Sequence, residues 1–388
     1  MAPARKTQIL LILGIIFISI NLRTSIASVG PLIPFIREDL GISNGLAGFL
    51  TTLSLITFAI FSLFAPRIGK YLGHGQAIFL GILILLIGVL IRVLGGVNLL
   101  FFGTALTGIG IVTANVLMIP FFKAMIPHKL GLMTAILSTG MSLFAAIASG
   151  ISVPLALDFG LGWRGSLASW AVLMVLALVL WTPQLGPKPT AAQRSIFPGK
   201  NVWKSRLAWQ VTLFMGAQSV MYFTMVTWLP DMLIAKGMSP THAGLALSYM
   251  QMISLIGTFF APEMLMRLKQ QSTVILWVAV GYFLGFSLLF FTHSSVIFTA
   301  LTIIGIGSGA SLSIAYTLIS LRTSEDQTTA RLSGMVQSAG YVLAALGPLL
   351  FGISLDFIGN WDLLIWFLLL MSMQFLFFGI PAGKDLKI

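Results

Sequence analysis

The sequence predicts an all-α integral membrane protein with twelve transmembrane helices, arranged as two parallel six-helix pseudo-repeats around a central cavity. Two features of composition and one of patterning carry this prediction. Hydrophobic residues make up 57% of the 388-residue chain and charged residues only 8%, whereas a soluble domain carries about 25% charged residues. Mean hydropathy is +1.01, and long apolar runs recur along the chain. The composition therefore excludes an ordinary soluble protein.

Apolar runs broken by charged residues, proline and glycine define the spans, since a helix needs about 20 apolar residues to cross the hydrocarbon core. The first run follows Arg5 and Lys6, as in a signal peptide, but it lacks a small-residue cleavage site and is too long, so we expect it to remain as the first span. The predicted spans cover 8–36, 45–65, 76–95, 99–122, 131–157, 164–182, 208–234, 242–262, 273–292, 296–320, 331–355 and 362–380.

The basic residues predict the orientation of the chain, which carries a net charge of +12. When the spans alternate across the membrane from a cytoplasmic N-terminus, most of the 22 Lys and Arg residues fall on the cytoplasmic side. The positive-inside rule then places both termini in the cytoplasm. Nucleic-acid binding is not expected, because it would need a basic face on a folded domain.

The two halves of the chain repeat each other. "PFIREDLGISNGLAG" (34–48) matches "PDMLIAKGMSPTHAG" (230–244), and "LDFGLGW" (157–163) matches "LDFIGNW" (355–361). Each half holds six predicted spans, an even number, so the repeat is parallel with respect to the membrane. This organisation is typical of transporters in which access to the substrate alternates between the two sides.

The repeat and the longest polar stretch set the expected domain boundaries. That stretch carries four prolines and five basic residues without an acid, and we interpret it as a cytoplasmic linker. We expect an N-terminal half over 1–182, the linker over 183–207 and a C-terminal half over 208–388.

Three stretches carry a resemblance to a known family. "NLRTSIASVGPLIPFIREDLGIS" (21–43) has an Asn-x-Arg followed by Val-Gly-Pro-Leu, "LIGVLIR" (86–92) ends in Arg92, and "APRIGKYLGHGQ" (65–76) lies between spans two and three. With the repeat, the chain resembles the major facilitator superfamily throughout. It is most similar to the bacterial cyanate and 2-nitroimidazole permease group. It departs from the superfamily at Pro66 and Lys70, where Gly and Asp are usual in the loop signature.

Arg23 lies in the middle of the first span, where a guanidinium costs at least about 2.5–3.5 kcal/mol. All ten acidic residues fall at predicted span ends or in loops. One interpretation is that the counter-charge is a transported substrate, because the planar fork of donors on arginine suits a carboxylate or a small oxyanion. Alternatively, Arg23 bonds backbone carbonyls at a helix break near Pro31, or extends along the cavity to water. Arg92 lies one turn before Gly95 and Gly96, so it either snorkels to the lipid headgroups or takes part in the cavity.

The resemblance implies that spans one, four, seven and ten line the cavity. In span one, Asn21, Thr24, Ser25 and Ser28 share one helix face. The candidate substrate-binding residues are Arg23, Asn21, Asn115, Gln218, Tyr222, Tyr316, Tyr341 and Arg92. Further candidates are Thr113, Trp228, Tyr249, Gln251 and Gln337. For each polar residue, an interhelical hydrogen bond is the alternative. Trp203 and Trp361, near span ends, are interpreted as interfacial anchors.

These features predict a secondary transporter of a small anion or anion-like polar compound, with Arg23 as the electrostatic anchor. The resemblance alone suggests cyanate-, nitro- or carboxylate-type substrates. The alternative is a multidrug or lipophilic-compound exporter of the same superfamily. We expect no enzyme activity, because no nucleophile–base pair, metal-ligand spacing or phosphate-binding loop is present. We expect no cofactor and no metal, and partners limited to a small-molecule substrate and the bilayer, with a monomeric chain.

Proton coupling usually needs a carboxylate or histidine inside the membrane. The four histidines lie in loops or near span ends, and only Asp39 or Asp231 could titrate at the mouth of a cavity. The sequence therefore favours a facilitator or an anion exchanger.

Overall fold

The computed structural model describes residues 5–126, 130–185, 201–268, 270–324, 326–384 and 386–388. Within these ranges the chain is helical and contains no β-strand. It divides into two compact units, the first comprising Met1–Ile42 and Leu53–Ile196 and the second Ser43–Thr52 and Phe197–Ile388. Residues 186–200 of the predicted linker lie outside the described residues.

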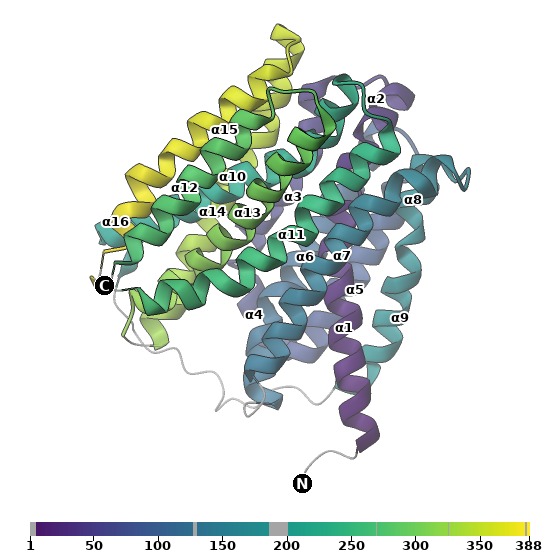
Figure 1. Ribbon diagram of the computed structural model, residues 1–388. Helices are drawn as coiled ribbons and strands as arrows, with labels where there is room; N and C mark the ends of the chain where they lie inside the picture. The colour runs from purple at the N-terminus through teal and green to yellow at the C-terminus, as the bar shows by residue number, and fades with distance from the viewer. Residues whose placement is uncertain (1–4, 127–129, 186–200, 269, 325, 385) are drawn as a thin grey trace. The chain divides into compact units, whose positions relative to one another are not determined.

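The first unit is built from long helices with short irregular connections (Figure 1). Its helices are α1 (Arg5–Ala27), α2 (Ile33–Leu40), the second half of α3 (Asn44–Phe61), α4 (Ala65–Leu72), α5 (His74–Ile91), α6 (Val97–Met125), α7 (Leu130–Leu157), α8 (Gly162–Ser169) and α9 (Ala171–Trp181), with single 3-10 turns at Gly30–Leu32 and Thr182–Gln184. Where a loop signature is expected at 65–76, the chain forms the short helix α4 instead.

The first predicted span, 8–36, is interrupted between α1 and α2. Helix α1 ends at Ala27, and the chain makes a 3-10 turn through Gly30 and Pro31 before α2 begins. Proline cannot donate a backbone hydrogen bond but fits the first turn of a helix, so it favours a break followed by a restart. Helix α2 then ends at Gly41, whose φ of 62° is the left-handed conformation typical of a helix C-terminus.

Glycines bring α5 and α6 into close contact. A methyl group on Gly88 would lie 2.7 Å from the carbonyl oxygen of Gly103, and one on Gly110 would lie 2.5 Å from that of Gly81. Such small-residue surfaces let helix backbones approach in a bilayer, where the hydrophobic effect does not drive helix association. Helix α1 packs against α7 and α9 in the same unit.

The second unit has the corresponding helices of the other half of the chain (Figure 1). They are α10 (Arg206–Ala235), α11 (Pro240–Arg267), α12 (Gln271–Leu288), α13 (Ser294–Leu321), α14 (Asp326–Ile358), α15 (Asp362–Gln374) and α16 (Ile380–Ala382), with a 3-10 turn at Val202–Lys204 and a π-helical turn at Phe375–Gly379. Helices α11 and α13 are in extended contact.

The second unit also contains residues 43–52, which the sequence places in the N-terminal half. The carboxylate of Asp356, near the end of α14, accepts hydrogen bonds from the backbone N–H groups of Asn44 and Gly45 and from the Asn44 side-chain amide, each at 2.8 Å. The first N–H groups of a helix lack partners within it and favour a negative charge, so this carboxylate stabilises the start of α3.

Each of the twelve predicted spans coincides with helical structure, and within the part of the chain that the structure describes, eleven helical segments are long and apolar enough to cross a membrane. The exception is α10, which is 30 residues long but carries Gln210, Gln218, Asp231 and several hydroxyl residues. Most of α10 is buried by its neighbours in the second unit. A helix enclosed by protein needs no apolar surface for lipid, so its polar residues are tolerated there.

Candidate functional site

Arg23 is the accessible residue in the second half of α1. Between residues 18 and 28, Arg23 is partly exposed and all the remaining residues are buried. The structure therefore leaves part of the Arg23 side chain accessible in a stretch of helix whose other residues are buried.

The polar face predicted beside Arg23 is buried. Asn21 has no exposed surface, and its amide donates to the carbonyl oxygens of Phe17 at 2.7 Å and Leu173 at 3.0 Å. The second bond joins α1 to α9, so Asn21 has the interhelical role that the sequence left open as the alternative. Thr24, Ser25 and Ser28 are buried as well. Helical spacing groups these residues correctly, but it does not show whether their face meets a cavity or another helix.

Arg92 does not snorkel to the lipid headgroups. It is the C-cap residue of α5 and is only 1% exposed, and its Nη1 donates to the carbonyl oxygen of Ser25 at 2.8 Å. That carbonyl is available because the N–H of Val29 bonds to Ile26 instead, at the break after α1. The cation therefore stabilises the negative C-terminal end of α1 from inside the unit.

On α6, Asn115 is partly exposed, whereas Thr113 is 2% exposed and its hydroxyl donates to the carbonyl oxygen of Ile109 at 2.8 Å. Asn115 therefore keeps its place among the candidates of the first unit. The hydroxyl of Thr113 is already bonded within its own helix.

Tyr222 is the partly exposed residue in a buried stretch of α10, as Arg23 is in α1. Between residues 214 and 233, all residues except Tyr222 are buried, and Tyr222 is partly exposed. Its hydroxyl donates to Oε1 of Gln251 on α11 at 3.3 Å, and its ring packs edge-on against Phe223 at 5.1 Å between centroids. Gln251 is 3% exposed, so an amide from α11 fixes the orientation of this hydroxyl.

The other candidates of the second unit have different environments. Tyr341, on α14, is largely buried and packs against the ring of Phe223 at 6.4 Å. Gln218, 3% exposed, donates to the hydroxyl of Ser219 at 2.8 Å. Tyr316, on α13, is 43% exposed. The structure thus brings Tyr222 and Tyr341 together around Phe223, whereas Gln218 is enclosed and bonded to its neighbour in α10.

Two tryptophans have structural roles. Trp228 is fully buried, and its indole N–H donates to the carbonyl oxygen of Pro348 at 3.0 Å. Trp361, expected to be an interfacial anchor, packs against Trp228 at 6.2 Å and Phe351 at 6.0 Å between ring centroids. Trp228 and Trp361 therefore both belong to an aromatic cluster with Phe351 of α14.

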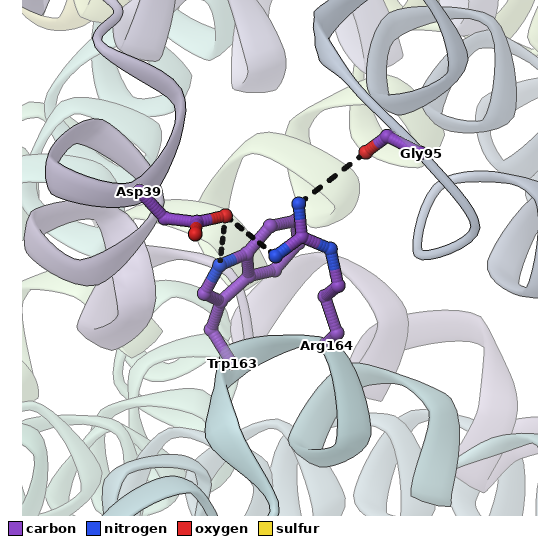
Figure 2. A network of polar contacts seen from close by, with 4 residues as sticks. All are labelled: Asp39, Gly95, Trp163 and Arg164. Carbon is purple, nitrogen blue, oxygen red and sulfur yellow. Dashed lines mark hydrogen bonds and ion pairs between the residues drawn. The ribbon is translucent and has the colours of Figure 1, made fainter.

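Asp39, one of the two carboxylates considered for proton coupling, belongs to a network in the first unit. Figure 2 shows its carboxylate contacting the indole N–H of Trp163 and the guanidinium of Arg164, which also reaches the carbonyl oxygen of Gly95. In the sequence, Trp163 stands out only as part of the repeated "LDFGLGW", and nothing there predicts its contact with Asp39, which is 124 residues away. The other carboxylate, Asp231, lies within α10 and is 5% exposed.

Two units of long apolar helices define a multi-pass membrane protein, and the accessible Arg23 and Tyr222 in their enclosed helices fit a protein that handles a small solute. Among the described residues, no group of three or more His, Cys, Asp or Glu could hold a metal ion. The sequence pattern of the Major Facilitator Superfamily matches residues 11–348. The chain therefore belongs to this superfamily of transporters and is not an enzyme.

Curated relatives agree with this family. The chain is 44% identical to an uncharacterized transporter, YycB, of Bacillus subtilis (strain 168), covering 97% of this chain and 94% of the relative. It is 36% identical to the 2-nitroimidazole transporter of Escherichia coli (strain K12), covering 99% and 98%, and 25% identical to the cyanate transport protein CynX of the same strain, covering 90% and 91%.

Solved structures support the fold. A crystal structure of the nucleoside transporter NupG superposes with a TM-score of 0.79 over 96% of this chain and 100% of that chain, at 13% sequence identity. At this identity the likeness supports the fold alone. It confirms the prediction of an all-helical membrane protein of the major facilitator type.

Proposed function

We propose that the protein moves a small anion, or a small polar compound that resembles one, across the bacterial cytoplasmic membrane by alternating access, with Arg23 as the electrostatic anchor. In this proposal both termini lie in the cytoplasm, as the distribution of basic residues favours. Cyanate-, nitro- and carboxylate-type compounds are the substrate classes to test first.

The observation that carries the proposal is the positive charge inside the first unit. Arg23 lies in the enclosed part of α1 and is the accessible residue there. Its guanidinium offers a planar set of donors that matches a carboxylate, a nitro group or a small oxyanion. Placing an ionisable residue within a membrane span costs free energy, and such residues commonly line the path of a substrate.

The second unit supplies groups suited to a flat, partly polar substrate. Tyr222 is accessible and hydrogen-bonded to Gln251, and Phe223 and Tyr341 pack beside it. Aromatic rings favour offset or edge-on contact with another ring, and a tyrosine hydroxyl can donate to an oxygen of the substrate. These residues support a contribution of the second unit to recognition.

The names of two relatives support the same substrate class. One is a 2-nitroimidazole transporter and the other a cyanate transport protein. Both compounds are small, and both present oxygen or nitrogen atoms that can accept hydrogen bonds from a guanidinium. Related transporters change substrate readily, so these names set the first compounds to test.

Thermal unfolding of the purified protein tests the proposal. A ligand that binds only the folded state raises the melting temperature, by RT ln(1 + [L]/Kd) in free energy. We expect cyanate, 2-nitroimidazole or 4-hydroxybenzoate to stabilise the wild-type protein and Arg67→Ala equally, and to leave Arg23→Ala unaffected. Arg67 lies on the exposed side of α4 and is the matched loss of one positive charge.

Transport into proteoliposomes separates binding from movement. The stabilising compound should accumulate in vesicles that contain the wild-type protein and not in those that contain Arg23→Ala. If only lipophilic drugs stabilise the protein, and Arg23→Ala responds as the wild type does, the guanidinium is structural and the chain is an exporter of lipophilic compounds.

A further inference from the structure

The guanidinium of Arg92 has an unused edge inside the first unit. Only Nη1 is bonded, to the carbonyl oxygen of Ser25 at 2.8 Å. The Nε and Nη2 atoms are both buried and have no hydrogen-bond partner among the described residues. Buried donors nearly always have a partner, so two on one side chain require an explanation.

The two unused atoms form the anion-binding edge of an arginine. Nη1 is the terminal nitrogen on the same side as Cδ, whereas the hydrogens of Nε and Nη2 point in parallel along the opposite edge. This pair makes the two parallel hydrogen bonds of a bidentate contact with a carboxylate or another oxyanion. The bond to Ser25 therefore leaves the whole edge available.

No buried carboxylate of the first unit compensates this charge. Its acidic residues are Glu38, Asp39 and Asp158, and all three are exposed. Asp39 is bonded to Arg164 and Trp163. Arg92 itself is only 1% exposed. A cation enclosed in this way is costly without a counter-charge.

Two hydroxyl groups in the last turn of α1 and directly after it also lack partners in the described part of the chain. Thr24 and Ser28 have no exposed surface, and the hydroxyl oxygen of each is without a partner among the described residues. Ser28 follows the last residue of α1, and its N–H bonds to the carbonyl oxygen of Thr24 at 3.0 Å, so the two residues lie on the same side of the chain. Thr24 directly precedes Ser25, whose carbonyl oxygen holds Arg92. A hydroxyl can rotate to donate to an anion.

We infer that Arg92, with the hydroxyls of Thr24 and Ser28, holds a small inorganic anion as a resident counter-ion of the first unit. A halide or a planar oxyanion of the size of nitrate fits the two parallel donors. The burial of Arg92 and of the α1 face favours an ion of a few atoms over an organic acid. This site is separate from Arg23, which is accessible and is proposed to meet the transported compound.

Anion-dependent stability of the purified full-length protein tests the inference. With gluconate as the only anion, chloride or nitrate is added and the melting temperature is followed. We expect it to rise with the concentration of the small anion in the wild-type protein and in Arg23→Ala. Arg92→Lys keeps the charge but lacks the two-donor edge, so the concentration for a half-maximal rise should increase at least tenfold.

Two further variants keep the test decisive if Arg92→Lys does not fold. Thr24→Val and Ser28→Ala retain Arg92 and should each raise the half-maximal chloride concentration several-fold. Equilibrium binding of radioactive chloride to the wild-type protein should give one ion per chain, not displaced by the compound that requires Arg23. The absence of bound chloride, or an anion response abolished by Arg23→Ala and retained by Arg92→Lys, would overturn the inference.

Discussion

The carboxylate of Asp39 lies 2.5 Å from Nη1 of Arg164 and 3.1 Å from the indole nitrogen of Trp163. Arg164 also lies over the Trp163 ring, 4.3 Å from its centre, and donates to the carbonyl oxygen of Gly95 at 3.4 Å. As Figure 2 shows, the network joins the end of α2, the loop after α5 and the start of α8. One acid and one base thus tie together three spans of the first unit.

The second unit has a related contact with the charges reversed. Nζ of Lys236, directly after α10, lies 4.0 Å from the carboxylate of Asp362 at the start of α15. The same Nζ donates to the carbonyl oxygen of Leu289, after α12, at 2.7 Å. Each unit therefore joins the end of its first span, the end of its third and the start of its last. The base stands on the last span in one unit and after the first span in the other.

We predict that Asp39→Asn lowers the melting temperature slightly and leaves the pH dependence of transport unchanged. Both partners are well exposed, with side chains 43% and 39% accessible, and exposed ion pairs contribute little and are screened by salt. The difference from the wild-type protein should shrink at high ionic strength. The readout is substrate uptake between pH 5 and 8, with the exposed Asp158→Asn as the control. A shifted pH profile in Asp39→Asn alone would make this carboxylate the proton carrier.

We predict that Asn21→Ala destabilises the protein without weakening substrate binding. The change removes the hydrogen bond from α1 to the carbonyl oxygen of Leu173, and interhelical bonds of this kind contribute about 0.6–1.7 kcal/mol. Unfolding by SDS measures the loss. Ser19→Ala is the control, because this buried hydroxyl bonds within α1, to the carbonyl oxygen of Ile16. A loss of substrate affinity as large as that of Arg23→Ala would return Asn21 to the binding site.

Two glycines of the second unit should respond in opposite ways to alanine. A methyl group on Gly309 of α13 would lie 1.7 Å from the carbonyl oxygen of Ser254 on α11, whereas one on Gly334 of α14 would meet nothing within 4 Å. Gly309→Ala must separate two helix backbones, and we expect a loss of about 1–3 kcal/mol. Gly334→Ala should be neutral or stabilise by up to about 1 kcal/mol. Equal effects in SDS unfolding would contradict the close packing of α11 and α13.

Much of the fold could be predicted from hydropathy, because the bilayer sets the length and polarity of a spanning helix. Hydropathy could not show that the first span breaks at Gly30 and Pro31. Nor could it assign residues 43–52 to the second unit, since the contact with Asp356 joins segments far apart in the sequence. Periodicity grouped Asn21 with Thr24 and Ser28, but only the packing of the neighbouring helices, α7 and α9 among them, shows that this face is enclosed.

The candidate residues divide for the same reason. A sequence shows that a polar residue lies within a span, whereas its exposure depends on the neighbouring helices. Arg23 and Tyr222 are accessible in their enclosed helices, and Arg92 and Gln218 are not. Arg92 differs most from one of its sequence-based interpretations, because its position near the external loop favoured contact with the lipid headgroups. Its actual partner, the carbonyl oxygen of Ser25, becomes available only through the break after α1.

Tyr222→Phe gives the most selective test of the second unit. The change keeps the ring against Phe223 and removes the hydroxyl that donates to Gln251 at 3.3 Å. If this hydroxyl helps to bind the substrate, we expect the KM for uptake to rise about two- to tenfold, the effect of one hydrogen bond of about 0.5–1.5 kcal/mol. The melting temperature without substrate should fall little, because the bond from Tyr222 to Gln251 is long at 3.3 Å and therefore weak.

Tyr249→Phe is the matched control for this prediction. Tyr249 lies on α11, is also partly exposed, and shares a hydrogen bond of 2.8 Å with the hydroxyl of Thr302 on α13. Its loss should lower the melting temperature, because a contact between α11 and α13 disappears, and should leave the KM unchanged. A pattern in which both variants change only the melting temperature would remove Tyr222 from the binding site and leave recognition to the first unit.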